Sequence, residues 1–137
     1  KAAGRQKTPP AFDGVDLSTG ENQLFGTNTV DKRHFTAFSM QHNTAANAEI
    51  ADEETIKIMN PLNYIGKPGV NLPQNWRIRV GTNDRDTSLA VSAVLAAKLQ
   101  NNGQTVDYAL PWDIGHSGDY DLDELFAWMK QVSSSAK

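Results

Sequence analysis

The sequence contains no cysteine, which excludes several classes of protein. Among its 137 residues there is no thiol for a disulfide framework, a cysteine-ligated zinc site or a thiol nucleophile. Basic residues are also few: the sequence has 13 Lys and Arg, compared with 16 Asp and Glu, and its net charge is -3. Nucleic-acid-binding domains, in contrast, are usually basic. No apolar run approaches the roughly 20 residues of a membrane-spanning helix. We therefore expect a globular domain, or a part of one, with neither nucleic acid nor a membrane as its partner.

The first part of the chain, residues 1–70, has little hydrophobic periodicity. It is rich in Thr, Asn, Gly, Asp and Pro, with short apolar anchors between them. An irregular segment of this length is typical of a lid or a binding loop. Within it we predict two short helices, over 30–41 and over 50–59, and we expect Asp52 to cap the second and Pro61 to end it.

The second part, residues 71–137, alternates strand and helix patterns. Large apolar side chains alternate with arginine over 76–80, which predicts a strand, and 106–110 predicts a second one. An almost uncharged helix is expected between them over 89–100, buried on most sides, and an amphipathic helix from 122 onward. The order strand, helix, strand, helix predicts parallel strands with flanking helices and an α/β fold.

Polar residues and glycine mark the ends of these helices. We expect Asp86 or Thr87 to cap the helix over 89–100, and Gly103 lies where a C-terminal cap belongs. We expect Asp121 to cap the last helix.

Two polar loops follow the two predicted strands, at the edge of an α/β sheet where ligands bind. The first carries Asp84 and Asp86, and the second carries His116. A carboxylate after one strand and a histidine after the next is the acid–histidine half of the Ser–Asp–His triad of α/β-hydrolases. In such a triad the carboxylate holds one ring nitrogen while the other takes the proton of the serine. Asp84 is the better candidate for that carboxylate because it lies deeper in its loop, whereas Asp86 either caps the next helix or faces the substrate.

A serine nucleophile cannot be identified in the sequence. None of its serines lies in a G-x-S-x-G motif or between a strand and a helix. The chain also begins at Lys1 instead of methionine, and no signal-peptide pattern follows. We therefore expect the C-terminal part of an α/β-hydrolase fold, either a processed product or a piece of a longer protein. Its partner would be an N-terminal polypeptide of the same enzyme, which carries the serine and the oxyanion hole.

Three segments in the second part of the chain carry a resemblance to a known family: W-R-I-R-V-G-T-N-D-R-D-T-S at 76–88, L-P-W-D at 110–113 and G-H-S-G-D-Y-D at 115–121. They resemble the C-terminal region of bacterial tannases (tannin acylhydrolases) and tannase-like esterases, and the resemblance extends over most of the chain. Upstream, T-P-P-A-F-D-G-V-D-L at 8–17 and E-N-Q-L-F-G at 21–26 resemble the lid and substrate-pocket region of that family.

The resemblance implies a serine esterase that hydrolyses galloyl or related hydroxybenzoyl esters without a metal or an organic cofactor. It implies that Asp84 orients His116, which is the triad base. It also implies that the hydroxyl groups of the galloyl ring bind to Asp86, Lys7 and Glu21. Carboxylates accept phenol protons and an ammonium donates in return, so a pocket built for these hydroxyls rejects a ring that lacks them.

Other interpretations stay open. The same acid–histidine half is compatible with a feruloyl esterase or a general carboxylesterase of the same fold. A non-catalytic α/β domain that binds a partner or a carbohydrate is the alternative from another class. The acidic run over 119–124 suggests calcium, but Glu124 and Lys130 occupy the positions where an EF-hand loop needs Gly and Glu.

Overall fold

The computed structural model describes residues 13–116, 118 and 120–134. They form two compact units, an N-terminal unit (13–72) and a C-terminal unit (73–134). Within the described part of either unit, no helix is long and apolar enough to cross a membrane.

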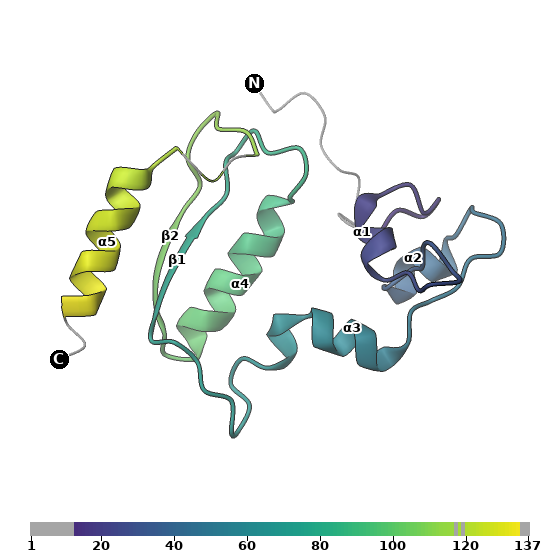
Figure 1. Cartoon of the computed structure of the whole chain (residues 1–137), viewed down its shortest axis with the longest axis horizontal. Coiled ribbons are helices and arrows are strands. Elements are labelled where there is room, and N and C mark those ends of the chain that lie inside the picture. The colour runs from purple at the N-terminus through teal and green to yellow at the C-terminus, as the bar shows by residue number, and fades with distance from the viewer. Residues whose placement is uncertain (1–12, 117, 119, 135–137) are drawn as a thin grey trace. The chain divides into compact units, whose positions relative to one another are not determined.

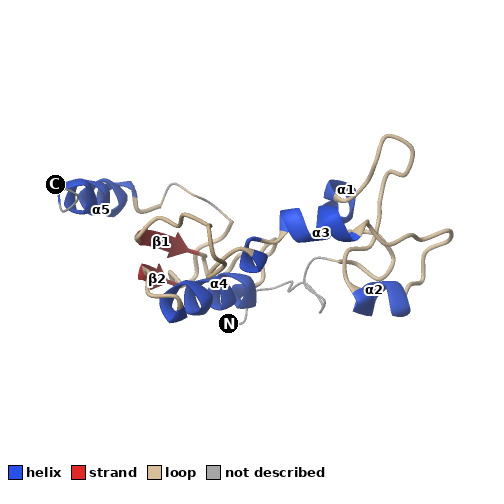
Figure 2. Ribbon diagram, turned by 90° about the horizontal axis from the view of Figure 1, so that it is seen from below, coloured by secondary structure: helices blue, strands red, loops and turns tan. Residues whose placement is uncertain are grey.

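The C-terminal unit is built around two parallel strands, β1 (Asn75–Arg79) and β2 (Thr105–Ala109). They pair from Asn75 opposite Thr105 to Arg79 opposite Ala109. Helix α4 (Leu89–Asn101) connects them and packs against the sheet, and α5 (Leu122–Ser134) follows β2. Figure 1 and Figure 2 show these two helices on opposite sides of the strands. A small parallel sheet with flanking helices is therefore present, as the sequence predicted.

The two faces of this sheet differ in chemistry because successive side chains of a strand point to opposite sides. On the side of α4, the hydroxyl groups of Tyr108 and Ser92 are hydrogen-bonded at 3.1 Å. On the other side Arg77, whose side chain is 7% exposed, donates to the carboxylate of Asp121 at 2.7 Å. Asp121 directly precedes α5, so this ion pair ties the start of that helix to the sheet.

Helix α4 begins at Leu89 as the sequence predicted, but its cap is a different residue. Its N-cap is Ser88, which accepts a hydrogen bond from the amide of Ala90 at 3.3 Å, so the expected cap at Asp86 or Thr87 is wrong. The amides of Asp86 and Thr87 instead donate to the carboxylate of Asp84. This keeps the chain in a turn until Ser88, where the helix can start.

The expected burial of α4 on most sides is also wrong for the described part of the chain. Its buried residues lie on the face toward the sheet: Ser92, Ala96 and Leu99. Val91 and Val94 are 43% and 52% exposed, because a two-stranded sheet covers one side of the helix. The helix ends as predicted, since Gly103 has a left-handed φ of 87° and its amide donates to the carbonyl of Gln100 at 3.0 Å.

The N-terminal unit contains short helices joined by irregular segments: α1 (Gly20–Leu24), α2 (Ala37–Gln41), α3 (Glu53–Met59) and the 3-10 turn η1 (Pro61–Asn63). The prediction of a helix capped by Asp52 is confirmed, because its carboxylate accepts from the amide of Thr55 at 2.8 Å. The helix predicted over 30–41 is confined to α2, because Thr36 caps it and His34 pairs with Ile50 in a parallel bridge.

The centre of the N-terminal unit is polar. The side chains with 0% exposure here are Asp13, Asn22, His34 and Ser39. On the apolar side, the rings of Phe25 and Phe35 stack with their centroids 4.1 Å apart. Buried polar groups are stable only when they are hydrogen-bonded, so this centre depends on the bonds that join its members.

Candidate active site

The loops that follow β1 and β2 bring a carboxylate and an imidazole together. The Oδ2 atom of Asp84 lies 3.0 Å from Nδ1 of His116. The side chain of Asp84 is 6% exposed, whereas that of His116 is 63% exposed. Parallel strands end at the same edge of the sheet, which explains why residues 32 positions apart meet here. The structure thus pairs the carboxylate and the histidine that the sequence pattern selected.

The second oxygen of Asp84 is fixed by the backbone of its own loop. Its Oδ1 atom accepts hydrogen bonds from the amides of Asp86 at 2.7 Å and Thr87 at 2.9 Å. Burial by itself raises the pKa of Asp84, but these amides and the hydrogen bond from His116 outweigh burial and hold the pKa below its ordinary value. The carboxylate is therefore both oriented and kept ionised.

Backbone contacts join the two loops below this pair. The amide of Thr82 donates to the carbonyl of Pro111 at 2.9 Å, and the Thr82 hydroxyl accepts from the amide of Asp113 at 2.8 Å. The amide of Asn83 donates to the carbonyl of Ile114 at 2.9 Å. These bonds continue the pairing of the strands into the loops and hold the loops at a fixed separation.

Gly81 completes this arrangement and was not identified from the sequence. It is buried at the end of β1, and the backbone of Ile114 occupies the space where its side chain would be. A glycine directly after a predicted strand is the signal that indicates such a close approach of two backbones.

The other predicted site residues lie in different places. Asp86 is exposed and lies beside the pair, since one ligand atom each from Asp84, Asp86 and His116 lie within 4.8 Å of one another. Glu21 is half-buried in α1 of the N-terminal unit. Lys7 lies outside the described residues. The structure therefore brings together three of the five predicted site residues.

Two carboxylates and an imidazole at this spacing also suit a divalent cation. A cation there would compete with the hydrogen bond between Asp84 and His116, because it would take the same Oδ2 and Nδ1 atoms or their neighbours. The cluster is accounted for without a metal by the acid–base pair and the carboxylate of Asp86 next to it.

This geometry suits general base catalysis. When Nδ1 of His116 donates to an ionised carboxylate, Nε2 is left in the tautomer that accepts a proton. Asp84 also stabilises the imidazolium that forms after the transfer. The exposed ring of His116 is accessible to a hydroxyl group from another part of an enzyme.

Solved structures of bacterial tannases are similar to this chain. The tannase from Lactobacillus plantarum shares 48% sequence identity over 93% of this chain, with a TM-score of 0.83. The tannase from Fusobacterium nucleatum shares 49% identity over 93% of this chain, with a TM-score of 0.81. A tannin acyl hydrolase in complex with ethyl gallate shares 48% identity over 93% of this chain, with a TM-score of 0.82.

The matched region is a minor part of those proteins. The chain spans 27% of the Lactobacillus plantarum tannase and 28% of the other two. Neither a protein-family model nor a curated protein sequence matches the chain. The resemblance of its motifs is nevertheless confirmed by identity and by structure, and the chain belongs to the bacterial tannase family as the counterpart of the C-terminal part of its longer members.

Proposed function

We propose that this chain supplies the acid–base pair of a serine esterase that hydrolyses galloyl or related hydroxybenzoyl esters. The hydrogen bond between Asp84 and His116 at the ends of two parallel strands carries the proposal. The similarity to tannin acyl hydrolases supports ester hydrolysis, and the solved complex of one of them with ethyl gallate supports an aromatic ester as substrate.

The serine nucleophile and the oxyanion hole lie on the N-terminal part of the complete α/β-hydrolase enzyme in this proposal. The similar tannases are longer chains, of which this chain spans 27 to 28%. An N-terminal part of the same polypeptide is therefore a simpler source of the serine than a separate subunit.

The reaction follows the acyl-enzyme route. His116 Nε2 takes the proton of the serine hydroxyl while its oxygen attacks the ester carbonyl, and Asp84 holds the Nδ1–H. Backbone amides stabilise the oxyanion. The imidazolium then protonates the alcohol as the ester bond breaks. In the second half His116 takes a proton from water, the hydroxide attacks the acyl-enzyme, and the proton returns to the serine as the aromatic acid leaves.

We assign ring recognition to three charged residues. The exposed carboxylate of Asp86 lies next to the acid–base pair, where it can accept a proton from a phenol hydroxyl. Glu21 would accept a second one, and Lys7 would donate to a phenol oxygen. This interpretation rests on the tannase-like motifs that contain Asp86 and Glu21 and on the position of Lys7 directly before another of them.

Labelling of the complete enzyme with a fluorophosphonate probe, followed by peptide mapping, tests the proposal. We expect one labelled serine outside these 137 residues, hydrolysis of methyl gallate, and strongly slowed labelling in a His116→Gln variant. A complete, folded enzyme without a labelled serine would contradict the triad. A labelled enzyme that hydrolyses methyl ferulate but not methyl gallate would indicate a feruloyl esterase.

A further inference from the structure

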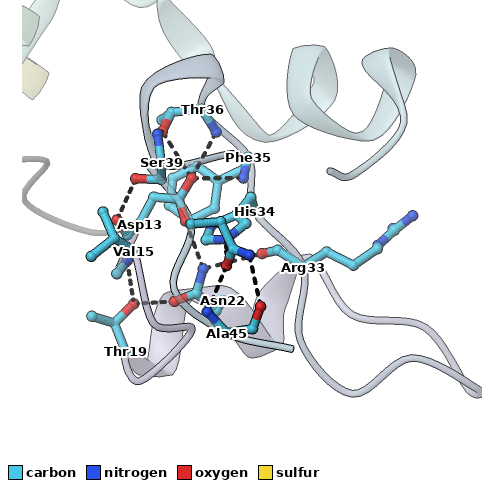
Figure 3. A network of polar contacts seen from close by, with 12 residues as sticks. Asp13, Val15, Thr19, Asn22, Arg33, His34, Phe35, Thr36, Ser39 and Ala45 are labelled. Carbon is cyan, nitrogen blue, oxygen red and sulfur yellow. Dashed lines mark hydrogen bonds and ion pairs between the residues drawn. The ribbon is translucent and has the colours of Figure 1, made fainter. Parts of the chain in front are cut away.

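A buried carboxylate organises the N-terminal unit, as Figure 3 shows. Asp13 is 0% exposed, and its Oδ1 atom accepts hydrogen bonds from Asn22 Nδ2 at 2.8 Å and from His34 Nδ1 at 2.7 Å. Its Oδ2 atom accepts from the amides of Phe35 and Thr36 at 2.9 and 2.8 Å and from the Thr36 hydroxyl at 2.8 Å. One side chain therefore joins α1 to the segment that precedes α2.

These donors keep Asp13 ionised in the interior. Burial raises the pKa of Asp13, but its hydrogen bonds lower the pKa by more than burial raises it, so the pKa lies below its ordinary value. The donors are His34, Phe35, Thr36 and Asn22. An unpaired carboxylate at this depth would be strongly destabilising. The hydrogen bonds are thus a condition for the fold of this unit around Asp13.

Both ring nitrogens of His34 lie within hydrogen-bond distance of a side-chain oxygen. The amide group of Asn43 is oriented by Ala45, whose N–H donates to Asn43 Oδ1 at 3.0 Å and whose carbonyl accepts from Asn43 Nδ2 at 2.7 Å. Oδ1 of Asn43 therefore faces His34 Nε2, 3.0 Å away, as an acceptor. Nδ1 faces the ionised Asp13 at 2.7 Å, so both nitrogens of the ring lie against an oxygen atom and the ring is held in place from two sides.

Asn22 connects the pair of Asp13 and His34 to α1. The side-chain amide of Asn22 donates to Asp13 and, at 3.1 Å, to the backbone carbonyl of Arg33. The backbone carbonyl of Asn22 accepts from the amide of Arg33, also at 3.1 Å. Its Oδ1 atom accepts from the hydroxyl of Thr19 at 2.7 Å. Helix α1 has five residues, which is too short for stability by itself. The position of α1 therefore depends on the bonds of Asn22.

We propose that Asp13, paired with His34, is a positioning residue that orients Glu21 toward the hydroxyl groups of the aromatic acid. Glu21 precedes Asn22 in α1, so the direction of its carboxylate follows from how Asn22 is anchored. The inference rests on the proposed function, in which Glu21 binds the ring. It assigns substrate specificity to an Asp–His pair that itself lies out of reach of substrate, since both side chains are 0% exposed.

The test compares two substrates with the complete enzyme. Methyl gallate has the ring hydroxyls, and p-nitrophenyl acetate has no aromatic acid. In an Asp13→Asn variant we expect the KM for methyl gallate to rise on the order of tenfold, with kcat and the turnover of p-nitrophenyl acetate nearly unchanged. A purely structural role would instead lower the activity on both esters to the same extent.

A milder variant makes the test independent of the stability of Asp13→Asn. Thr19→Val keeps the shape of the side chain and removes the hydroxyl, which donates to Asn22 at 2.7 Å and accepts from the amide of Gly14 at 3.4 Å. We expect it to raise the KM for methyl gallate about threefold, because the short bond to Asn22 is the stronger of the two and its loss has the effect of one hydrogen bond. Thr29→Val is the matched control, because Thr29 is exposed and its hydroxyl is hydrogen-bonded to that of Thr27 in the same loop.

The outcomes separate the two proposals. Wild-type enzyme that does not hydrolyse methyl gallate overturns the proposed function and this inference with it. Hydrolysis by the wild type, together with a Thr19→Val variant whose KM for methyl gallate equals that of Thr29→Val, overturns the role of Asp13 and leaves the proposed function standing.

Discussion

Gly81 lies against the backbone of Ile114 so closely that no side chain fits between them. A Cβ atom at position 81 would overlap the carbonyl group of Ile114 and would lie 2.9 Å from the carbonyl oxygen of Gly115. His116 is the next residue along the chain. The contact at Gly81 therefore sets the distance of His116 from the end of β1, and with it the distance from Asp84.

Exchange of Gly81 for alanine is expected to move the histidine loop. The added Cβ would push the backbone of Ile114 and Gly115 away and displace His116 with it. We predict that kcat of the complete enzyme falls by about 10- to 100-fold in Gly81→Ala, because a shift of about 1 Å at a reacting group can slow a reaction by about 100-fold. Gly103→Ala is the control. Its φ of 87° makes an alanine strained, but apart from the adjacent residues no atom of the described part of the chain lies within 4 Å of the added Cβ, so this variant should lose thermal stability and keep its kcat. Equal kcat values in the two variants would show that the loop tolerates the displacement.

Replacement of Asp84 by asparagine is expected to preserve the loop and to remove the acid. The oxygen of the amide can still accept from the amides of Asp86 and Thr87, while its NH2 group faces Nδ1 of His116. The imidazole is then held in the wrong tautomer. We predict that kcat falls by about 10⁴, the loss that the same exchange causes in a serine protease triad. An unchanged kcat would move the acid role to Asp86.

Loss of the Asp86 carboxylate is expected to affect selectivity. Asp86 is exposed and its side chain does not cap α4, so Asp86→Ala should leave the fold intact. We predict that kcat/KM for methyl gallate falls by about 10-fold or more, because a phenol hydroxyl loses its acceptor. Turnover of p-nitrophenyl acetate should stay near the wild-type value. Equal losses on both esters would argue against contact between Asp86 and the ring.

The depressed pKa of Asp84 predicts a pH dependence of stability. Because its folded-state value is below the ordinary value of 3.8, the unfolded chain binds a proton first as the pH falls. The stabilisation from ionised Asp84 is therefore complete above its ordinary pKa and is lost as the pH falls through the folded-state value. Urea unfolding of wild type and Asp84→Asn between about pH 6 and pH 2 measures it. The difference in unfolding free energy should shrink toward low pH, and a constant difference would contradict this.

The sequence indicated those features of the fold that depend on residues close together along the chain. Alternation of apolar residues with arginine predicted β1, and the apolar spacing predicted α4 and α5, within one or two residues of the observed ends. The loops with Asp84 and His116 followed from the chain order, because parallel strands must end at one edge. The α4 cap was predicted wrongly because the carboxylate of Asp84 accepts hydrogen bonds from the amides of Asp86 and Thr87, which delays the start of the helix until after Ser88. Sequence spacing alone does not show that turn.

The polar centre of the N-terminal unit was not visible in the sequence. Asp13 and His34 are 21 residues apart and belong to no periodic pattern, so in the sequence each looks like an ordinary polar residue of a loop. Only the folded chain shows that five hydrogen bonds meet at one carboxylate. Long-range polar pairing of this kind has no local signature, in contrast to helix caps such as Asp52.

The register of the two strands also limits how this chain can change in length. Arg79 lies opposite Ala109, and the two loops of the site start directly beyond them. One residue inserted in either strand would shift its loop by about 3.3 Å and turn the side chains of that strand to the opposite face. Insertions at Asn102 and Gly103, at the opposite end of the sheet, leave the loops where they are. Length variation among relatives should therefore be found at that turn and not within β1 or β2.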